Sequence, residues 1–410
     1  MRFQGTRGGT PLDFRQAVSL GYPGDGGYFV PEALFEGSAN LRSAVYAPLA
    51  GFAEVVALAA SELLPEVLDP RHLVDIVLES YASEPPLHQV DKDILVLDMA
   101  TGASSSSADY AAAFEARLLG RLAEPGKDFV LAATSSFRDA AALGAAFAAK
   151  GTGLPLVLLC PEGQEGGLAA TLAGGRASPV LVLEVEGGPA AAAALERNLA
   201  GHSLAGRRVM AGGAASPSRL VGRSLLLIGL FSIARRGLSG DLIVTAPPGD
   251  LLGLVTGLWA WSWGLPVSAF LLPDLEGDVR HEGECLAAGP EWADASGEPD
   301  SLAGAEMLRS FGRDRPLGSL VLRMPLPPGS RGEVLVDGLS LDKGSGLALE
   351  AARAALAGGL AGHGTIVVPR FAGPVPVPPA APARSSRPCP LIEAKPGALE
   401  AAISAFLGQA

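Results

Sequence analysis

From about residue 91 onward, short apolar runs alternate with alanine-rich segments. The runs DILVLDM, FVLAATS, LPLVLLC and PVLVLEVEG are each followed by a stretch with helical spacing of its apolar residues. The same alternation resumes at DLIVTAPP and VSAFLLP. Strands that are apolar throughout are typical of a parallel sheet covered on both faces. The pattern therefore predicts an α/β protein with mostly parallel sheets.

The two ends of the chain follow a different pattern. Residues 1–90 carry apolar residues at spacings of three and four, which predicts a mostly helical segment, with Asp69-Pro70 as one helix start. Residues 374–390 hold seven prolines and predict an extended surface connection, and the tail GALEAAISAFLGQA predicts a closing helix. We expect three parts: residues 1–90, a core at 91–370, and a connection with a final helix at 371–410.

A stretch of 23 residues, Leu251–Pro273, contains no charge and has the length of a membrane span. Pro266 follows Gly264 and divides the stretch into a helix-like half and a strand-like half. Asp250 and Asp274 stand at its ends, where anchoring Lys or Arg residues would be expected of a span. We therefore expect a buried helix that leads into a core strand, and no membrane partner.

Composition narrows the function classes. The chain has 410 residues, of which 48% are hydrophobic and 18% charged, so it can bury a sizeable core and is not globally disordered. Its net charge of −12 gives no electrostatic footprint for nucleic acid. Cys160, Cys285 and Cys389 form no CxxC motif, and no signal-peptide-like start is present, so we expect a cytoplasmic protein. The five histidines lack metal-ligand spacing, so no metal site is expected.

Several segments, taken in order, resemble the threonine synthase family. They are Thr6-Arg7-Gly8 with FRQAVSLGYPGDGGYFVPEAL after it, residues 129–160, VLEVEG at 182–187, and APPGDLLGLVTGLWAWSWGLPV at 246–267. The resemblance implies a two-lobed, fold type II pyridoxal-phosphate (PLP) enzyme architecture, similar to tryptophan synthase β, with an N-terminal helical segment. It also implies a cofactor held between the lobes.

The family's PLP lysine is followed by an Asp-Phe pair. The matching stretch here runs from Gly102 to Tyr110, and Ala108 occupies the lysine position before Asp109. A methyl group can neither form an imine nor carry a proton. The resemblance therefore predicts that position 108 supplies no catalytic residue.

Three further segments of this chain differ from the family segments that they resemble. The phosphate-binding turn reads Gly249-Asp250-Leu251-Leu252-Gly253, so Asp250 either opposes a phosphate or caps the following helix. The Ser-rich turn keeps Ser135, with Ser136 and Arg138 as a helix cap or an anion site. A later segment keeps Asp342 and Ser345, with Lys343 as a conceivable migrated lysine.

These positions define a candidate remnant of a ligand pocket. Its members are Ser104, Ser105, Ser135, Ser136, Arg138, Gly249, Asp250 and Ser345.

Two principal functions follow from the resemblance. The first is a pseudoenzyme without PLP that binds a small phosphorylated or amino-acid ligand, or serves as a scaffold that pairs with itself or with a true family enzyme. The alternative is an active PLP-dependent threonine synthase, converting O-phosphohomoserine and water to threonine and phosphate, with another lysine such as Lys92 or Lys127. A lyase or hydrolase with new chemistry is a third possibility.

Overall fold

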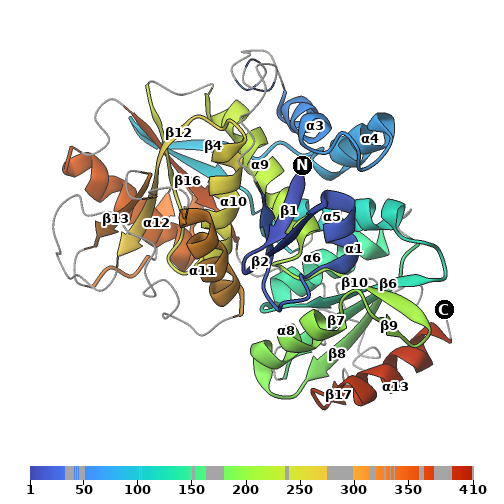
Figure 1. Ribbon diagram of the computed structural model, residues 1–410. Coiled ribbons are helices and arrows are strands. Elements are labelled where there is room, and N and C mark those ends of the chain that lie inside the picture. The colour runs from blue at the N-terminus through green and yellow to red at the C-terminus, as the bar shows by residue number, and fades with distance from the viewer. Residues whose placement is uncertain are drawn as a thin grey trace.

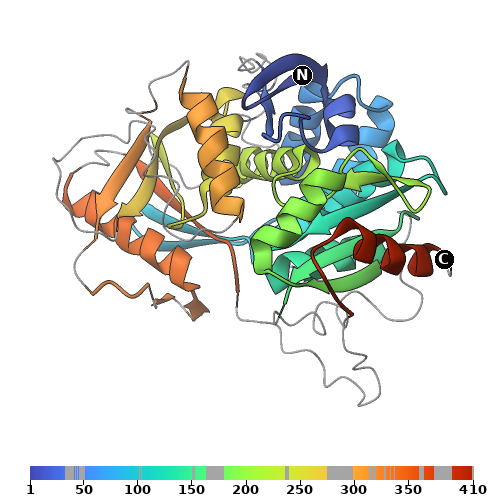
Figure 2. The ribbon, with the colours of Figure 1, turned by 60° about the horizontal axis from the view of Figure 1, so that its bottom comes forward.

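Two lobes, each built on a six-stranded sheet, lie on either side of a long central helix (Figure 1, Figure 2). The computed structural model describes residues 1–32, 41, 43, 45, 51–100, 102, 104–149, 153–162, 180–235, 240–274, 299–313, 317, 320–326, 329–332, 334–336, 338–359, 364–373 and 390–408.

The first lobe contains a sheet of order β17-β8-β7-β6-β10-β9, in which only β9 runs antiparallel to its neighbour. Its strands are β6 (Asp128–Ala133), β7 (Leu156–Pro161), β8 (Val180–Val185), β9 (Ser203–Leu204), β10 (Arg207–Ala211) and β17 (Leu391–Ile392). The accompanying helices are α6 (Phe137–Ala148), α8 (Gly188–Leu199) and α13 (Pro396–Leu407). Strand β17 and the closing helix α13 return from the C-terminus to this lobe (Figure 2).

The second lobe contains a sheet of order β13-β12-β11-β16-β5-β4, in which only β4 is antiparallel. Its strands are β4 (Leu87–Asp91), β5 (Ile94–Asp98), β11 (Leu242–Thr245), β12 (Val267–Asp274), β13 (Val321–Pro325) and β16 (Thr365–Arg370). Beside it lie α10 (Leu251–Ser262), α11 (Pro299–Gly312), α12 (Lys343–Ala357) and the hairpin β14 (Leu335–Val336) with β15 (Leu339–Ser340). The two sheets confirm the predicted mostly parallel α/β architecture.

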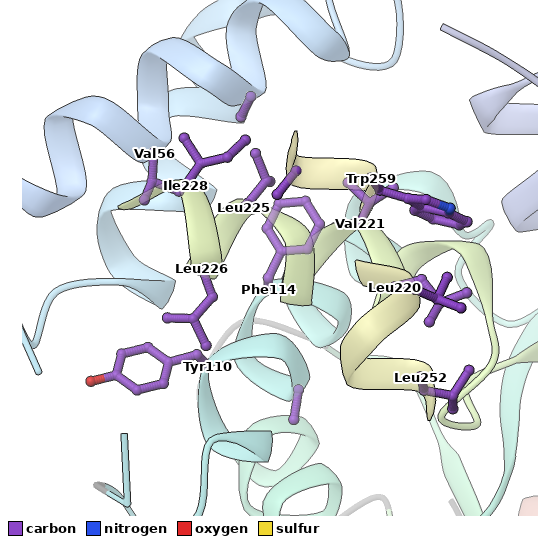
Figure 3. Close-up of a cluster of buried hydrophobic side chains, with 14 of the residues drawn as sticks. Val56, Tyr110, Phe114, Leu220, Val221, Leu225, Leu226, Ile228, Leu252 and Trp259 are labelled. Atoms are coloured by element: carbon purple, nitrogen blue, oxygen red, sulfur yellow. The ribbon is translucent and has the colours of Figure 1, made fainter. Parts of the chain in front are cut away.

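The central helix α9 (Pro217–Ala234) packs against α5 (Ala108–Leu122), α10 and the N-terminal helices. Figure 3 shows Phe114, Val221, Leu225 and Ile228 at this junction, with Trp259 of α10 beside them. Helix α9 is the one described helix long and apolar enough to cross a membrane, and 89% of its apolar window is buried inside the protein.

The stretch Leu251–Pro273 divides as predicted into helix α10 and strand β12. Trp259 and Trp263 of this stretch are fully buried, with ring centroids 6.1 Å apart, and both belong to the core. The stretch is therefore interior to the protein and gives no support for a membrane span.

The N-terminal segment holds helices α1 (Phe14–Leu20), α3 (Phe52–Leu63) and α4 (Pro70–Ser80). Asp69 caps α4, as the sequence predicts, by accepting from the Arg71 N–H at 2.9 Å. Helical spacing did not reveal a three-stranded antiparallel sheet of β1 (Arg2–Gly5), β2 (Gly8–Asp13) and β3 (Phe29–Pro31). Strands β1 and β3 are too short for a period of two to be recognised, and two glycines at positive φ, Gly8 and Gly9, begin β2 directly after the turn.

This N-terminal sheet connects the two lobes. Arg7 pairs with Glu306 of α11 in the second lobe at 3.0 Å. Arg197 of α8 in the first lobe donates to the Tyr28 hydroxyl, also at 3.0 Å. The segment thereby fixes how the lobes face each other. The proline-rich residues 374–389, which the sequence predicts to be an extended connection, lie outside the described residues.

A test of this packing is the substitution Gly229→Ala in α9. A Cβ at Gly229 would meet the Val56 side chain and lie 2.6 Å from Cε2 of Phe52 in α3. We expect overpacking to lower the free energy of unfolding by about 1–3 kcal/mol, measured by urea denaturation. Gly397→Ala in α13, where a Cβ meets nothing within 4 Å, is the matched control and should leave stability nearly unchanged. Equal effects of the two substitutions would contradict this account of the α3–α9 contact.

Candidate functional site

Each lobe has a topological switch point at the carboxyl ends of its parallel strands. In the first sheet the chain runs from β6 to β7 and β8, then returns to β10 on the other side of β6. In the second it runs from β11 to β12 and β13, then returns to β16 on the other side of β11. Open α/β sheets bind ligands at such points. The segments that follow β5, β6 and β11 contain most of the candidate residues.

The segment before α5 is closed by its own hydrogen bonds. The Asp109 carboxylate accepts from the Ser104 hydroxyl at 2.7 Å and from its N–H at 3.2 Å, and Ser104 also contacts Ser106 at 2.8 Å between hydroxyl oxygens. Ser104 is fully buried. Burial raises the pKa of Asp109 even though these hydrogen bonds lower it. Ala108 follows as the first residue of α5, and its methyl packs against the main core.

The four described lysines are all exposed. Lys92 stands in the turn between β4 and β5, and Lys343 is exposed at the start of α12. Lys127 and Lys395 are exposed and paired with Glu124 and Glu393, respectively. Lys150 lies outside the described residues. None of the four described lysines is buried, so the idea of a migrated lysine at Lys343 gains no support.

A buried ionic cluster lies next to position 108. Arg219 of α9 is 2% exposed, and its guanidinium is 3.1 Å from Oε2 of Glu115 and 3.1 Å from Oδ1 of Asp139. Its Nη1 also donates to the Ala108 carbonyl at 3.4 Å. We call Arg219, Glu115 and Asp139 the buried ionic cluster. It joins the middle of α5 to the first turns of α6 and α9.

Two serines complete this cluster. The hydroxyls of Ser216 and Ser218 each donate to Oε1 of Glu115 at 2.7 Å. Burial raises the pKa of Glu115 to about 7, although Arg219 and the serines act in the opposite direction. Sequence reasoning missed this cluster. The one available signal was a glutamate among apolar residues of α5 and an arginine in the first turn of an apolar helix.

Asp250 caps α10. Its Oδ1 accepts from the Gly253 N–H at 2.8 Å, and Nη2 of Arg223 lies 3.3 Å from both carboxylate oxygens. The prediction of an N-cap is confirmed. A carboxylate therefore already satisfies the N-terminus of α10 and neutralises the neighbouring arginine.

Both serines of the turn after β6 also form hydrogen bonds within the protein. Ser136 caps α6 by accepting from the Asp139 N–H at 3.2 Å, which confirms the predicted serine cap. Ser135 donates to Oδ2 of Asp300 in α11 at 2.7 Å, and this bond crosses from the first lobe to the second. Burial raises the pKa of Asp300 to about 6, and the nearby carboxylates of Asp139 and Asp250 act in the same direction.

Arg138 lies at the meeting of three segments. Its Nη1 donates to the Ser105 carbonyl at 3.0 Å and its Nη2 to the Gly373 carbonyl at 2.6 Å. The Gly373 N–H in turn donates to the Ser105 carbonyl at 2.9 Å. Ser105 adopts a φ of 50°, a backbone region that costs energy for a residue with a side chain. The loop before α5, helix α6 and the chain after β16 are thereby joined.

Ser345 belongs to the same region. It is fully buried in the first turn of α12, where its N–H donates to the capping Asp342 at 3.1 Å. Its hydroxyl accepts from the Phe371 N–H at 3.4 Å. The structure thus brings Ser104, Ser105, Arg138 and Ser345 together. It places Ser135, Ser136, Gly249 and Asp250 in a second group, near the N-terminus of α11, where Ser301 donates to the Gly249 carbonyl at 3.1 Å.

Comparison with known proteins gives a fold but no sequence family. No protein-family model and no curated protein matches the chain. Among solved structures, the threonine synthase from Escherichia coli is 20% identical, with a TM-score of 0.75 over 98% of this chain and 99% of that one. PLP-bound threonine synthase from Brucella melitensis is 17% identical, with a TM-score of 0.71 over 99% of each chain. Threonine synthase from yeast is 16% identical, with a TM-score of 0.71, covering 100% and 99%.

The chain has the threonine synthase fold. The predicted fold type II architecture is thereby confirmed over the whole chain. Maize serine racemase, at a TM-score of 0.51, is similar over only 74% of this chain.

The Brucella melitensis threonine synthase of this fold binds PLP, and the described residues of this chain do not fit that cofactor. At position 108 the side chain is a methyl, and the four described lysines are exposed. At α10 the Asp250 carboxylate occupies an N-terminal N–H that a phosphate would need. No group of three or more His, Cys, Asp or Glu side chains arranged for a metal occurs among the described residues either.

Removing the cation of the buried ionic cluster is the first test of this site. Arg219→Gln leaves Glu115 and Asp139 without their partner, and we expect a loss of about 3–5 kcal/mol in the free energy of unfolding. Arg353→Gln, which removes an exposed ion pair with Asp91, is the matched control. We expect it to cost less than about 1 kcal/mol. Urea denaturation measures both, and a small effect at Arg219 would show that the cluster is not structurally required.

A second test uses the pH dependence of stability. Because the pKa of Asp300 is raised, the neutral acid favours the folded state; this contribution is present below the ordinary aspartate pKa and is lost as pH rises through about 6. In Asp300→Asn the side chain stays neutral. We expect the variant to gain about 1–3 kcal/mol relative to the natural chain between pH 4 and pH 8. Asp91→Asn, an exposed position, is the control. Parallel pH profiles for the natural chain and Asp300→Asn would contradict the prediction.

Proposed function

We propose that this protein is a pseudoenzyme of the threonine synthase fold, which has lost PLP catalysis and binds a small molecule at the carboxyl ends of its sheets. The observation that carries the proposal is Ala108, which stands at the start of α5 without an amine. An imine with the cofactor aldehyde requires a lysine nitrogen. We expect the protein to act in the cytoplasm, alone or paired with a second copy or a true enzyme.

Other sites support the same proposal. At α10, Asp250 and Arg223 neutralise each other, so a dianionic phosphate would meet a carboxylate. At α6, the Ser136 hydroxyl already accepts from an N-terminal N–H, that of Asp139. A single lost residue could be replaced from elsewhere in the chain, but changes at several separate positions indicate that the whole cofactor site has been given up.

The alternative is an active PLP-dependent threonine synthase that converts O-phosphohomoserine and water to threonine and phosphate. In its favour, the fold matches threonine synthases over nearly the full length. It would need a lysine directed into the site, and Lys92 and Lys127 lie elsewhere, whereas Lys343 follows Asp342 but is exposed. We therefore favour the pseudoenzyme.

Borohydride trapping separates the two functions. The full chain is incubated with PLP, reduced, digested and analysed by mass spectrometry for phosphopyridoxyl-lysine peptides. We expect only scattered, substoichiometric labelling of exposed lysines. Ala108→Lys serves as the accessibility control, because labelling at its new lysine would show that position 108 can be reached by PLP. A stoichiometric adduct on one lysine of the natural chain would end the pseudoenzyme proposal.

Ligand binding is tested without PLP. A small ligand that binds only the folded state raises the melting temperature as its concentration rises above the Kd. We expect a rise with at least one amino acid or phosphate monoester in a thermal-shift screen. If no compound in the screen raises the melting temperature, the small-molecule-binding role is wrong and only the scaffold role is left.

A further inference from the structure

We infer that Arg138 and Arg370 form a binding site for a small oxyanion, a carboxylate or a phosphate, beside Gly373. This inference rests on the proposed small-molecule-binding function and adds the class of ligand group. We call Arg138, Arg370 and Gly373 the two-arginine site.

Both guanidinium groups lie beside Gly373. Nη2 of Arg138 is 2.6 Å from the Gly373 carbonyl oxygen. A Cβ added at Gly373 would stand 3.1 Å from Nη2 of Arg370. The glycine therefore leaves the space next to the Arg370 guanidinium free of a side chain. The chain reaches Gly373 directly after β16, at the switch point of the second sheet.

Arg370 has unused hydrogen-bonding capacity. It is 5% exposed, and its Nη1 pairs with Asp98 of β5 at 2.7 Å. Its Nε is buried and has no acceptor in the structure. A guanidinium nitrogen without an acceptor in the interior is costly, because it has lost water and gained nothing in return. The orphan Nε therefore points to an acceptor that the described chain does not supply.

The positive charge of Arg138 is not paired with a carboxylate of the described chain. Its described hydrogen-bond acceptors are the carbonyl oxygens of Ser104, Ser105 and Gly373, and its guanidinium lies 5.5 Å from the ring centroid of Phe137. Its partial burial lowers its pKa, and the nearby Arg370 acts in the same direction, whereas Asp342 raises it. The Asp342 carboxylate is itself occupied, because it accepts from Ser345 and from the Ala372 N–H.

The chemistry of two adjacent arginines selects the ligand. A guanidinium presents parallel N–H groups that match the two oxygens of a carboxylate or two of the three of a phosphate. An anion near both arginines would relieve their mutual repulsion and supply the missing acceptor. The strained φ of Ser105, on the loop that Arg138 holds, fits a backbone fixed by function.

The test is titration of the full chain, at constant ionic strength, with inorganic phosphate in one arm and acetate in the other. Isothermal titration calorimetry reports affinity and a thermal melt reports folding. We expect at least one of the two anions to bind the natural chain. We expect Arg138→Gln to bind it about tenfold more weakly or worse, as loss of a charge-assisted hydrogen bond implies. The arm that responds identifies a phosphate or a carboxylate as the ligand group.

Two further variants keep the test decisive. Arg370→Lys retains a cation for Asp98 but lacks the guanidinium Nε, so it should fold and still lose affinity. Arg353→Gln, on the exposed outer face of α12, should bind as the natural chain does. Unchanged affinity in Arg138→Gln, or no binding of either anion to the natural chain, would overturn the two-arginine site. A stoichiometric PLP adduct would overturn the pseudoenzyme proposal instead, so the two failures are distinguishable.

Discussion

The N-termini of several helices meet where the carboxyl ends of the two sheets face each other, and the partial positive charge there must be balanced. In this chain the balance comes from its own carboxylates. Asp250 satisfies α10 and Asp342 satisfies α12, each through hydrogen bonds to backbone N–H groups. Asp109 does the same for the loop that opens α5. Internal anions thus hold positions that, in a fold of this kind, are natural places for a bound phosphate.

The buried ionic cluster follows from the same constraint. Glu115 lies in the middle of α5 and Asp139 in the first turn of α6, and two carboxylates placed there without a cation would be strongly disfavoured. Arg219 supplies that cation from the first turn of α9. Its contact with the Ala108 carbonyl places the guanidinium beside position 108. A lysine there would add a second cation next to Arg219, which agrees with the small residue found.

The sequence predicted a strand, a helix or a helix cap correctly wherever one short segment contains all the residues that form it. The apolar runs predicted the parallel strands, and Pro266 predicted the change from α10 to β12. Asp250 and a serine before α6 were predicted as caps, and the capping serine is Ser136. The remaining features depend on residues far apart in the chain. Glu115 and Arg219 come from different helices, and the two-residue strand β17 is recognisable only by its pairing with β8. No local pattern encodes such partners.

The pairing of β5 with β16 has a consequence for how the protein is made. The neighbouring strands β5 and β16 of the second sheet come from residues 94–98 and 365–370. The main strands of the first sheet, β6, β7, β8 and β10, all lie between residues 128 and 211. During synthesis the first lobe can therefore assemble early, while the edge of the apolar β5 opposite β4 waits for β16 until near the end of translation. A nascent chain of this fold exposes an unpaired strand edge for most of its synthesis, so shielding by chaperones at the ribosome is expected to matter more for its yield than for that of proteins with local strand pairing.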